Sequence, residues 1–234
     1  MPVINTNVNS IVAQNATNKS DRAMTKTMEK LATGYRINKA GDDAAGLAVS
    51  TKLTAQIRGT NQAARNVSDA IALVQTADGA AKEISAIMQR MRELAVQGAT
   101  ETYSTDDLGL MDIEYQQLEA EITRIVAQTK WNKMELLDGS GGSGGAGAFI
   151  IQVGSDNAQA VTVSIGNLDI AAGSLGCLSG LDVSTQSNAS SAITNIDGAF
   201  QALATIRADY GSYMNRLENT LNNAEVFSAN MSDA

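Results

Sequence analysis

The side chains that most often carry out chemistry are scarce in this sequence. Histidine is absent from its 234 residues, which excludes a Ser-His-Asp triad, a Cys-His dyad and histidine-based zinc sites. The single cysteine, Cys177, cannot form an intramolecular disulfide, and its apolar Gly/Ser-rich surroundings predict a buried, inert thiol. We therefore expect a protein that is not an enzyme, with no catalytic residue, no metal site and no cofactor.

Two further segments could suggest a ligand site. Asp42 and Asp43 are adjacent carboxylates, but no oxygen cluster at calcium-loop spacing accompanies them. A helix N-cap that accepts backbone N–H bonds is therefore the better interpretation of this pair. The tract DGSGGSGGAG, residues 138–147, lacks the lysine that ends a phosphate-binding loop, so it predicts a flexible linker.

The charge of the chain is unevenly distributed. Residues 1–134 carry 15 basic and 15 acidic side chains, whereas residues 135–234 carry two basic and 10 acidic ones, which gives the net charge of -8. This balance argues against a nucleic-acid partner, which would require a basic surface. No run of apolar residues is long enough for membrane insertion, and residues 1–20 lack the features of a cleavable signal peptide. Export, if it occurs, must therefore use another route.

Apolar periodicity predicts long helices toward both ends of the chain. A first helix is expected over residues 5–33, followed by a break and a second, proline-free helix over 44–98. In the second helix, apolar residues repeat every seven positions in two stripes, so it requires more than one partner helix. The apolar positions of the first helix are Val8, Ile11, Val12, Met24, Met28 and Leu31.

The strongest periodic signal lies in residues 108–125. Apolar residues there step by three and four alternately, which predicts a helix that returns antiparallel along the preceding one. A final helix is expected over residues 188–231, with Arg207 interrupting its apolar seam. The seam residues that we expect to form the bundle core are Leu108, Met111, Tyr115, Leu118, Ile122 and Ile125, with Phe200, Leu203, Leu217 and Leu221 of the final helix.

The segment between these helices has a different pattern. Apolar residues alternate in residues 149–153 and 161–165 around Gly-Ser-Asp-Asn, which predicts a β-hairpin, and residues 167–186 are expected to be irregular. The fold class is therefore mainly α, an elongated antiparallel bundle of long helices with coiled-coil-like packing and a small β-hairpin insert. Three parts follow from this. They are an N-terminal helix and loop (1–43), a discontinuous rod-like bundle (44–137 and 186–234) and a Gly-rich insert (138–185).

Several segments of the sequence resemble bacterial flagellin. They are MPVINTN at the start, LATGYRIN at 31–38, DDAAGLA at 42–48, QRMRELAVQ at 89–97, and Asn132-Lys133 followed by LLDG at 136–139. The resemblance covers about residues 1–139 and 188–234. It implies a self-assembling structural subunit of the flagellar filament, used for motility and secreted through the flagellar export channel. The resemblance assigns to assembly the six apolar positions of the first helix given above. It further implies other flagellin subunits, the flagellar cap and junction proteins and the export apparatus as partners.

The resemblance also implies a receptor-binding surface. In some flagellins the matching residues bind Toll-like receptor 5, the vertebrate innate receptor; the alternative interpretation is a solvated helix face. The residues are Gln89, Arg90, Glu93, Leu94, Gln97 and Glu114. Flagellins also continue past the point that matches Ala234, with a helix that pairs with the N-terminal one. The resemblance therefore implies that the chain is truncated or cleaved at this end.

Two other classes of protein remain as alternatives. A hook-filament junction protein would resemble flagellin at both ends, although usually not in the receptor-like residues. A coiled-coil signalling hairpin would need a heptad pattern that continues through the middle of the chain, and the β-like insert argues against it. An enzyme is the least favoured class, because the metalloprotease insert of some flagellins needs histidine.

Overall fold

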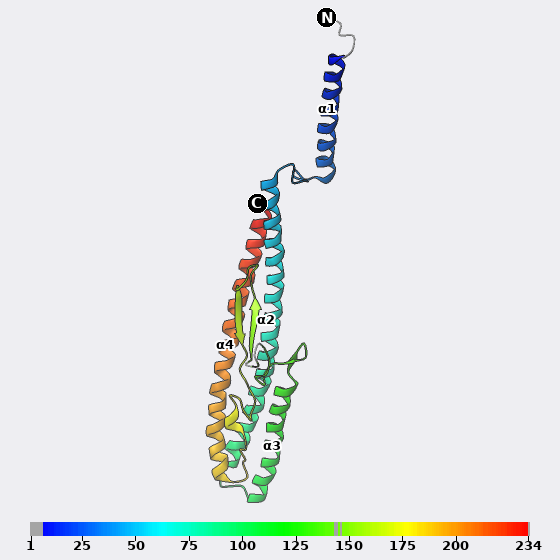
Figure 1. The fold of residues 1–234 in the computed structure, drawn as a ribbon. Helices are drawn as coiled ribbons and strands as arrows, with labels where there is room; N and C mark the ends of the chain where they lie inside the picture. The colour runs from blue at the N-terminus through cyan, green and yellow to red at the C-terminus, as the bar shows by residue number, and fades with distance from the viewer. Residues whose placement is uncertain (1–6, 143–144, 146, 234) are drawn as a thin grey trace. The chain divides into compact units, whose positions relative to one another are not determined.

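The computed structural model describes residues 7–142, 145 and 147–233 and is mainly α-helical (Figure 1). Contacts divide the chain into two compact units, residues 1–56 and 57–234, so the boundary falls within the second helix. Each unit is described separately below. The division of the chain at residues 43, 137 and 185 stays a prediction.

The first unit contains helix α1 (Val8–Thr33) and the start of α2 (Ala44–Gly98), joined by a loop. The Asn7 side chain caps the start of α1, and Gly34 ends it in the left-handed conformation, with φ of 72°. Asp43 caps α2, because its Oδ1 accepts a 2.9 Å hydrogen bond from a backbone N–H of the first turn. The predicted N-cap is thus confirmed for Asp43, whereas the Asp42 carboxylate faces α1.

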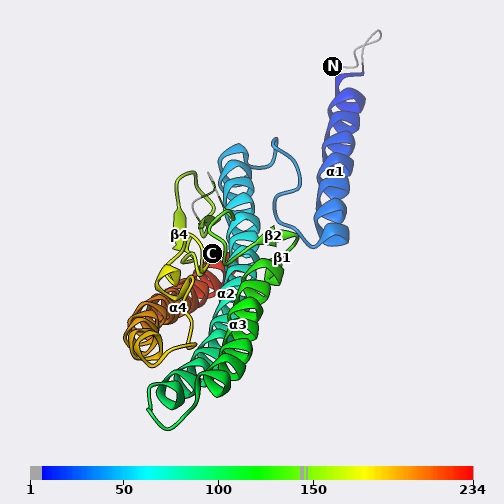
Figure 2. The same cartoon turned by 90° about the horizontal axis from the view of Figure 1, so that it is seen from below.

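The second unit is an elongated helical bundle, which confirms the fold class predicted from the sequence. Helix α3 (Thr105–Gln128) returns antiparallel to α2, and α4 (Gln186–Asp233) also lies along α2 in the antiparallel direction (Figures 1 and 2). Ser104 and Asp107 form a capping box at the start of α3, in which each side chain accepts from the backbone N–H of the other. This reciprocal cap fixes where the chain turns from α2 into α3.

The bundle core is thin and rich in small residues. One set of α2 residues that repeats every seven positions is fully buried, namely Val67, Val74, Ala81, Met88 and Ala95. Alanines of α4, including Ala189, Ala192 and Ala199, belong to the same apolar cluster. Small side chains let helix axes approach closely, so few aromatic residues are needed to fill this core.

Two antiparallel hairpins follow α3. Strands β1 (Lys130–Trp131) and β2 (Met134–Glu135) join through Asn132 and Lys133, which have φ of 48° and 68°. This tight turn, with positive φ at both central residues, was not predicted. Strands β3 (Ala148–Gln152) and β4 (Ala160–Ser164) form the predicted hairpin, one residue earlier in each strand than expected.

The Gly/Ser tract before β3 is partly fixed. Residues 143, 144 and 146, which fall within the predicted flexible linker, lie outside the described residues. At the end of the tract, the Gly147 N–H donates to Gly141 O, and Gly147 O accepts from the N–H of Ile165, each over 2.8 Å. With φ of 66°, Gly147 adopts a conformation that favours glycine, so this end of the tract forms part of the hairpin base.

The segment after β4 is largely irregular, as expected, but it contains a short 3₁₀ helix, η1 (Gly176–Leu178). Leu175 and Leu178 are fully buried on its inner side. Cys177 is exposed, so the prediction of a buried thiol is wrong. The reason is geometric: the two leucines are three residues apart, so in a 3₁₀ turn they share the inward face and Cys177 is directed outward.

Candidate functional site

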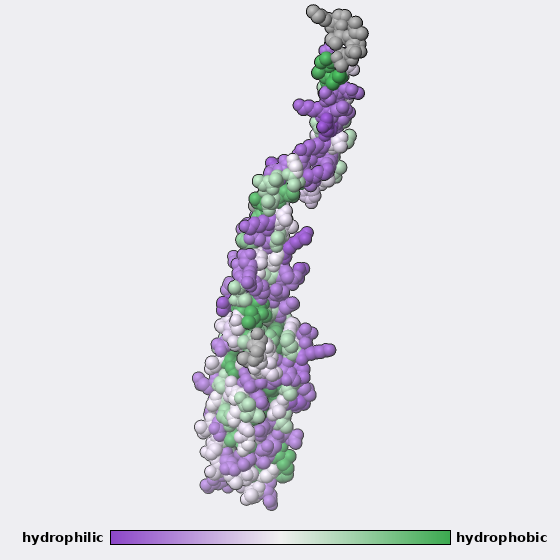
Figure 3. All heavy atoms as spheres, in the orientation of Figure 1, coloured by the Kyte–Doolittle hydropathy of each residue, from purple (hydrophilic) through white to green (hydrophobic). Residues whose placement is uncertain are grey.

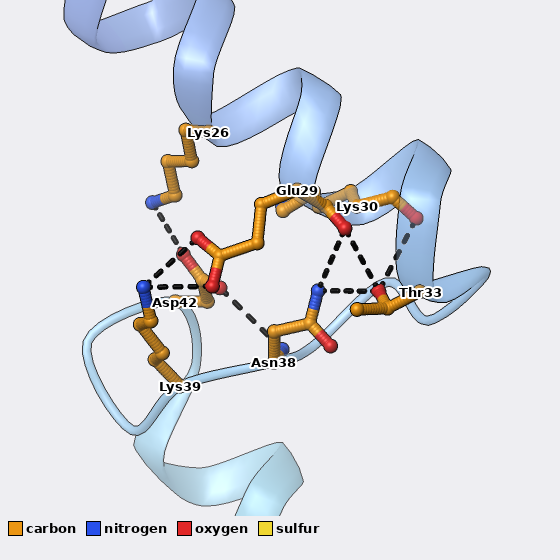
Figure 4. A network of polar contacts seen from close by, with 7 residues as sticks. All are labelled: Lys26, Glu29, Lys30, Thr33, Asn38, Lys39 and Asp42. Carbon is orange, nitrogen blue, oxygen red and sulfur yellow. Dashed lines mark hydrogen bonds and ion pairs between the residues drawn. The ribbon is translucent and has the colours of Figure 1, made fainter.

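The loop of residues 34–43 is held against one side of α1 by polar contacts (Figure 4). Lys26 Nζ lies 2.5 Å from Asp42 Oδ1, and Lys39 Nζ lies 2.7 Å from a carboxylate oxygen of Glu29. The hydrogen bond from Lys26 lowers the pKa of Asp42, and the hydrogen bond to Glu29 raises the pKa of Lys39. Each shift favours the charged form of Asp42 and of Lys39, so these two ion pairs hold the loop to this side of the helix.

The apolar side chains of α1 are uncovered. No residue of α1 is buried, and its six predicted assembly residues are between 51% and 79% exposed. Figure 3 shows hydrophobic residues, in green, at the surface of this helix among hydrophilic ones in purple. Because an α-helix turns by about 100° per residue, these side chains occupy two roughly opposite faces. One face carries Val8, Ile11 and Val12, and the other carries Met24, Met28 and Leu31.

The predicted receptor residues form a charged surface between α2 and α3. Arg90 Nε donates to Glu114 Oε1 over 2.8 Å, and Arg90 Nη1 lies 3.1 Å from a carboxylate oxygen of Glu93. The carboxylate of Glu114, followed by that of Glu93, raises the pKa of Arg90. Gln89 and Gln97 are also exposed. The structure thus brings five of the six residues together at the surface, where they present both signs of charge.

Leu94, the sixth of these residues, lies below the surface. It is only 2% exposed and belongs to the bundle core. Beside the charged residues is a groove of about 650 Å³, whose walls include Val96, Gln97 and Tyr103. The Gln97 side-chain amide donates to the Tyr103 hydroxyl over 3.1 Å, which joins the end of α2 to the turn before α3.

All ten predicted seam residues lie in or against the bundle core, but they differ in burial. Leu108, Tyr115, Ile122, Leu203 and Leu217 are buried. The other five are partly buried and pack against the core, namely Met111, Leu118, Ile125, Phe200 and Leu221. A bundle of three helices leaves the outer edge of each seam in contact with solvent, which explains the difference.

Ion pairs between α2 and α4 were not predicted. Arg207 Nε donates to Asp78 Oδ1 over 2.8 Å, and Arg92 Nε donates to Asp197 Oδ1 over the same distance. One indication of such a pair was present in the sequence, because Arg207 is a charged residue that interrupts an apolar seam. The partner of each arginine could not be found from spacing, because the paired residues are more than 100 positions apart.

Within residues 7–142, 145 and 147–233, no cluster of three or more Cys, Asp or Glu residues is placed to hold a metal ion. Across the same residues, none of the helices is both long enough and apolar enough to cross a membrane. The features that remain as candidates for function are therefore surfaces: the open faces of α1 and the charged face of α2 and α3.

Comparison with known sequences shows which proteins this chain resembles. The family described as the bacterial flagellin N-terminal helical region matches residues 4–141. A flagellin of Halalkalibacterium halodurans is 43% identical over 209 residues, which cover 89% of this chain and 75% of that protein. Flagellin FlaB1 of Treponema pallidum is 37% identical, and the match covers 99% of this chain and 84% of that protein.

Solved structures agree with the sequence comparisons. The crystal structure of Bacillus cereus flagellin is similar with a TM-score of 0.59 and 33% identity, covering 68% of this chain and 88% of that one. A putative flagellar hook-associated protein from Vibrio parahaemolyticus has a TM-score of 0.54, covering 83% of this chain and 95% of that one. Its identity of 13% shows a shared fold alone.

The helical bundle and its open surfaces define a structural protein of the bacterial flagellum. The chain belongs to the bacterial flagellin family. It is a structural subunit of the flagellar filament, in keeping with relatives that are flagellins and flagellar filament core proteins.

Proposed function

We propose that this subunit assembles with other copies of itself through the two open apolar faces of α1. The observation that carries the proposal is that α1 has 26 residues, none of them buried, and six large apolar side chains that are more than half exposed. An isolated helix of this kind gains little from folding, because most helical stability in proteins comes from packing of an apolar face. Large exposed apolar surfaces of this type are typical of sites that bind other proteins.

The position of the two faces supports an open assembly rather than a closed pair. Val8, Ile11 and Val12 are directed away from the side that carries Met24, Met28 and Leu31. One neighbouring helix cannot cover both sides of α1, so each α1 needs at least two helices packed against it. Contacts that join different surfaces of identical subunits, and that do not close into a ring, produce a helical filament.

The mechanism is binding coupled to ordering, without a catalysed reaction. Complete burial of a Val, Leu, Ile or Met side chain contributes roughly 1.5–3 kcal/mol, which offsets the entropy lost when α1 becomes fixed among its neighbours. By resemblance to the family, the subunit travels through the flagellar export channel and contacts the cap and junction proteins.

Polar substitutions in α1 test the assembly proposal. Ile11→Ser and Leu31→Ser, one on each face, should each reduce the amount of filament that sediments and that is seen by negative-stain microscopy. Ile150→Ser on β3 is the matched control, because Ile150 is 61% exposed but lies outside α1. Assembly of both α1 variants at the level of the parent would overturn the proposal.

A second candidate function is recognition by Toll-like receptor 5. It is supported by the exposed group of Gln89, Arg90, Glu93, Gln97 and Glu114, which lies on two adjacent helices and is ordered by ion pairs. The receptor would contact these five side chains and the adjoining groove. Leu94 would act from beneath by holding α2 in place, since it is 2% exposed. A binding titration with the receptor ectodomain tests this function, as developed in the Discussion.

A further inference from the structure

Two methionines of α1 are unusually open to solvent. Met24 and Met28 are 59% and 63% exposed, whereas Met88 and Met91 in the bundle core are fully buried. Among the methionines that the structure describes, Met134 on β2 is the other largely exposed one, at 41%. A methionine side chain in a protein interface is apolar and adaptable, but its thioether can be oxidised where it is accessible.

The local fold keeps the methionine face of α1 open. Met24 and Met28 are one turn apart and share a face with Leu31, which is 79% exposed. The loop of residues 34–43 cannot cover this face, because it is fastened to the opposite one. Its anchors, Lys26, Glu29 and Thr33, lie on the far side of the helix and are directed toward the loop (Figure 4).

We propose that Met24 and Met28 form a redox-sensitive modification site whose oxidation by a peroxide blocks subunit assembly. This inference rests on the proposed function, because it takes the face of Met24, Met28 and Leu31 as an assembly surface. In the reaction, a lone pair of the methionine sulfur attacks one peroxide oxygen, and the O–O bond breaks as the S–O bond forms. The sulfur is oxidised by two electrons to the sulfoxide. With hydrogen peroxide, the transferred oxygen gives up its proton, and the other oxygen, which leaves as hydroxide, takes up that proton to become water.

Oxidation would act on the free subunit. A sulfoxide replaces an apolar thioether with a polar group that binds water, so the modified face loses much of its tendency to become buried. In an assembled filament the same side chains would be covered by a neighbour and protected from the oxidant. The site therefore makes entry of a subunit into the filament sensitive to peroxide, while finished filament is resistant.

Peptide mass spectrometry after treatment with hydrogen peroxide tests the chemical part. In the free chain, Met24, Met28 and Met134 should each gain one oxygen atom well before Met88 and Met91. Filaments treated in the same way should gain oxygen at Met24 and Met28 at least about tenfold more slowly than the free chain. Equal oxidation rates of Met24, Met28 and the two buried methionines would overturn the site, and equal rates in free chain and filament would overturn the protection by assembly.

Sedimentation assays test the consequence for assembly. Peroxide should raise the critical concentration of the parent at least about tenfold, and methionine sulfoxide reductases of both stereospecificities should restore it. The double variant Met24→Leu with Met28→Leu should assemble after peroxide as it does before, whereas the control Met134→Leu should respond as the parent does. If the leucine variant fails to assemble, reversal by the reductases together with an unchanged peroxide response of Met134→Leu keeps the effect on the exposed methionines of α1.

The proposed function and the redox inference can fail separately. Oxidised parent that assembles as well as untreated parent would overturn the redox inference alone. Untreated parent that forms no filament would overturn the proposed function and the inference with it. A loss of assembly that persists in the oxidised double leucine variant, or that disappears in Met134→Leu, would assign the effect to another methionine and overturn the site.

Discussion

Arg90 on α2 donates from Nε to Glu114 on α3 over 2.8 Å, and a terminal nitrogen of the same guanidinium lies 2.7 Å from that carboxylate oxygen. The centre of the proposed receptor surface is therefore already paired within the subunit. This pairing fixes the direction of the guanidinium and leaves about half of each side chain exposed. A partner would meet an ordered cluster of charges, which reduces the entropy lost on binding.

This relationship leads to the first prediction, in which recognition and stability separate. Arg90→Ala should weaken binding to the receptor ectodomain by about 2 kcal/mol, because an ordered arginine fork is a typical interface hot spot. Its free energy of unfolding should stay close to that of the parent, since both ion pairs are exposed and screened by solvent. A binding titration and a denaturant melt of each variant measure the two effects.

Glu83→Ala is the control for Arg90→Ala, because Glu83 is an exposed charged residue of α2 outside the receptor group. It should bind and unfold like the parent. If Arg90→Ala binds as the parent does, or loses binding only because it unfolds, the similarity of residues 89–97 to other flagellins reflects packing of the bundle, and the receptor proposal fails.

The second prediction concerns Leu94, which lies beneath the same surface. Leu94→Ala should lower the free energy of unfolding by about 2–5 kcal/mol, because it leaves a cavity at a position that is 2% exposed. Val96→Ala, two residues further along α2 and 47% exposed, should change it by less than about 0.5 kcal/mol. Equal stability of the two variants in urea denaturation would contradict the placement of Leu94 in the core.

The helical part of the fold could be predicted because its signal is local and repeated. Val67, Val74, Ala81 and Met88 recur every seven residues, and that spacing fixes one face of a long helix whatever the partner. Start signals were equally local: Asp43 and Ser104 satisfy backbone N–H groups within their own first turns. Such features need no knowledge of the rest of the chain.

The features that could not be predicted depend on distant or subtle information. The β1–β2 hairpin has strands of two residues and a turn of Asn132 and Lys133, which is weaker as a turn signal than Asn-Gly. The partner of Arg207 lies 129 residues away on another helix. Cys177 was misplaced because loop composition does not specify which side of a turn is buried. Pairing of Arg90 with Glu114 depends on the register of α3 against α2, which only the folded structure defines.

A third prediction distinguishes two glycines in the interior of α2. Replacing an interior helical glycine with alanine ordinarily stabilises a helix by about 0.5–1 kcal/mol. Gly79→Ala should do so, because a Cβ at this position meets no other atom within 4 Å. Gly59→Ala should show no such gain, or a loss, because the new Cβ would lie 2.9 Å from Cβ of Ser155 in the β3–β4 turn.

Thermal melts compare the two glycine variants directly, and hydrogen exchange locates the effect. Residues 154–159 should lose protection in Gly59→Ala, because the hairpin turn must move away from α2, and should keep it in Gly79→Ala. An equal gain in stability for both variants would show that Ser155 does not rest against α2 in solution.

The last prediction concerns Tyr115, whose ring is fully buried against the bundle core. In the part of the chain that the structure describes, its hydroxyl has no hydrogen-bond partner. Burial raises its pKa above the ordinary value of 10.0, because the interior disfavours the charged phenolate. As the pH rises, the unfolded chain therefore loses this proton first. The contribution of Tyr115 to the free energy of unfolding is therefore fully present below pH 10. It should decline as the pH rises from there toward the pKa of Tyr115 in the folded state.

Tyr115→Phe removes both the unpaired hydroxyl and the titration. At neutral pH the variant should be as stable as the parent or slightly more stable, because no hydrogen bond is lost. Between pH 10 and about pH 11 it should lose less stability than the parent, although Tyr210 is buried in the same way and will still contribute. Tyr103→Phe, which removes a tyrosine hydroxyl at an exposed position, is the comparison variant for the substitution itself. Urea denaturation at the two pH values measures the difference. An identical alkaline loss in the parent and Tyr115→Phe would mean that Tyr115 ionises as freely in the folded subunit as in the unfolded chain. Its ring would then not be enclosed in the bundle core in solution.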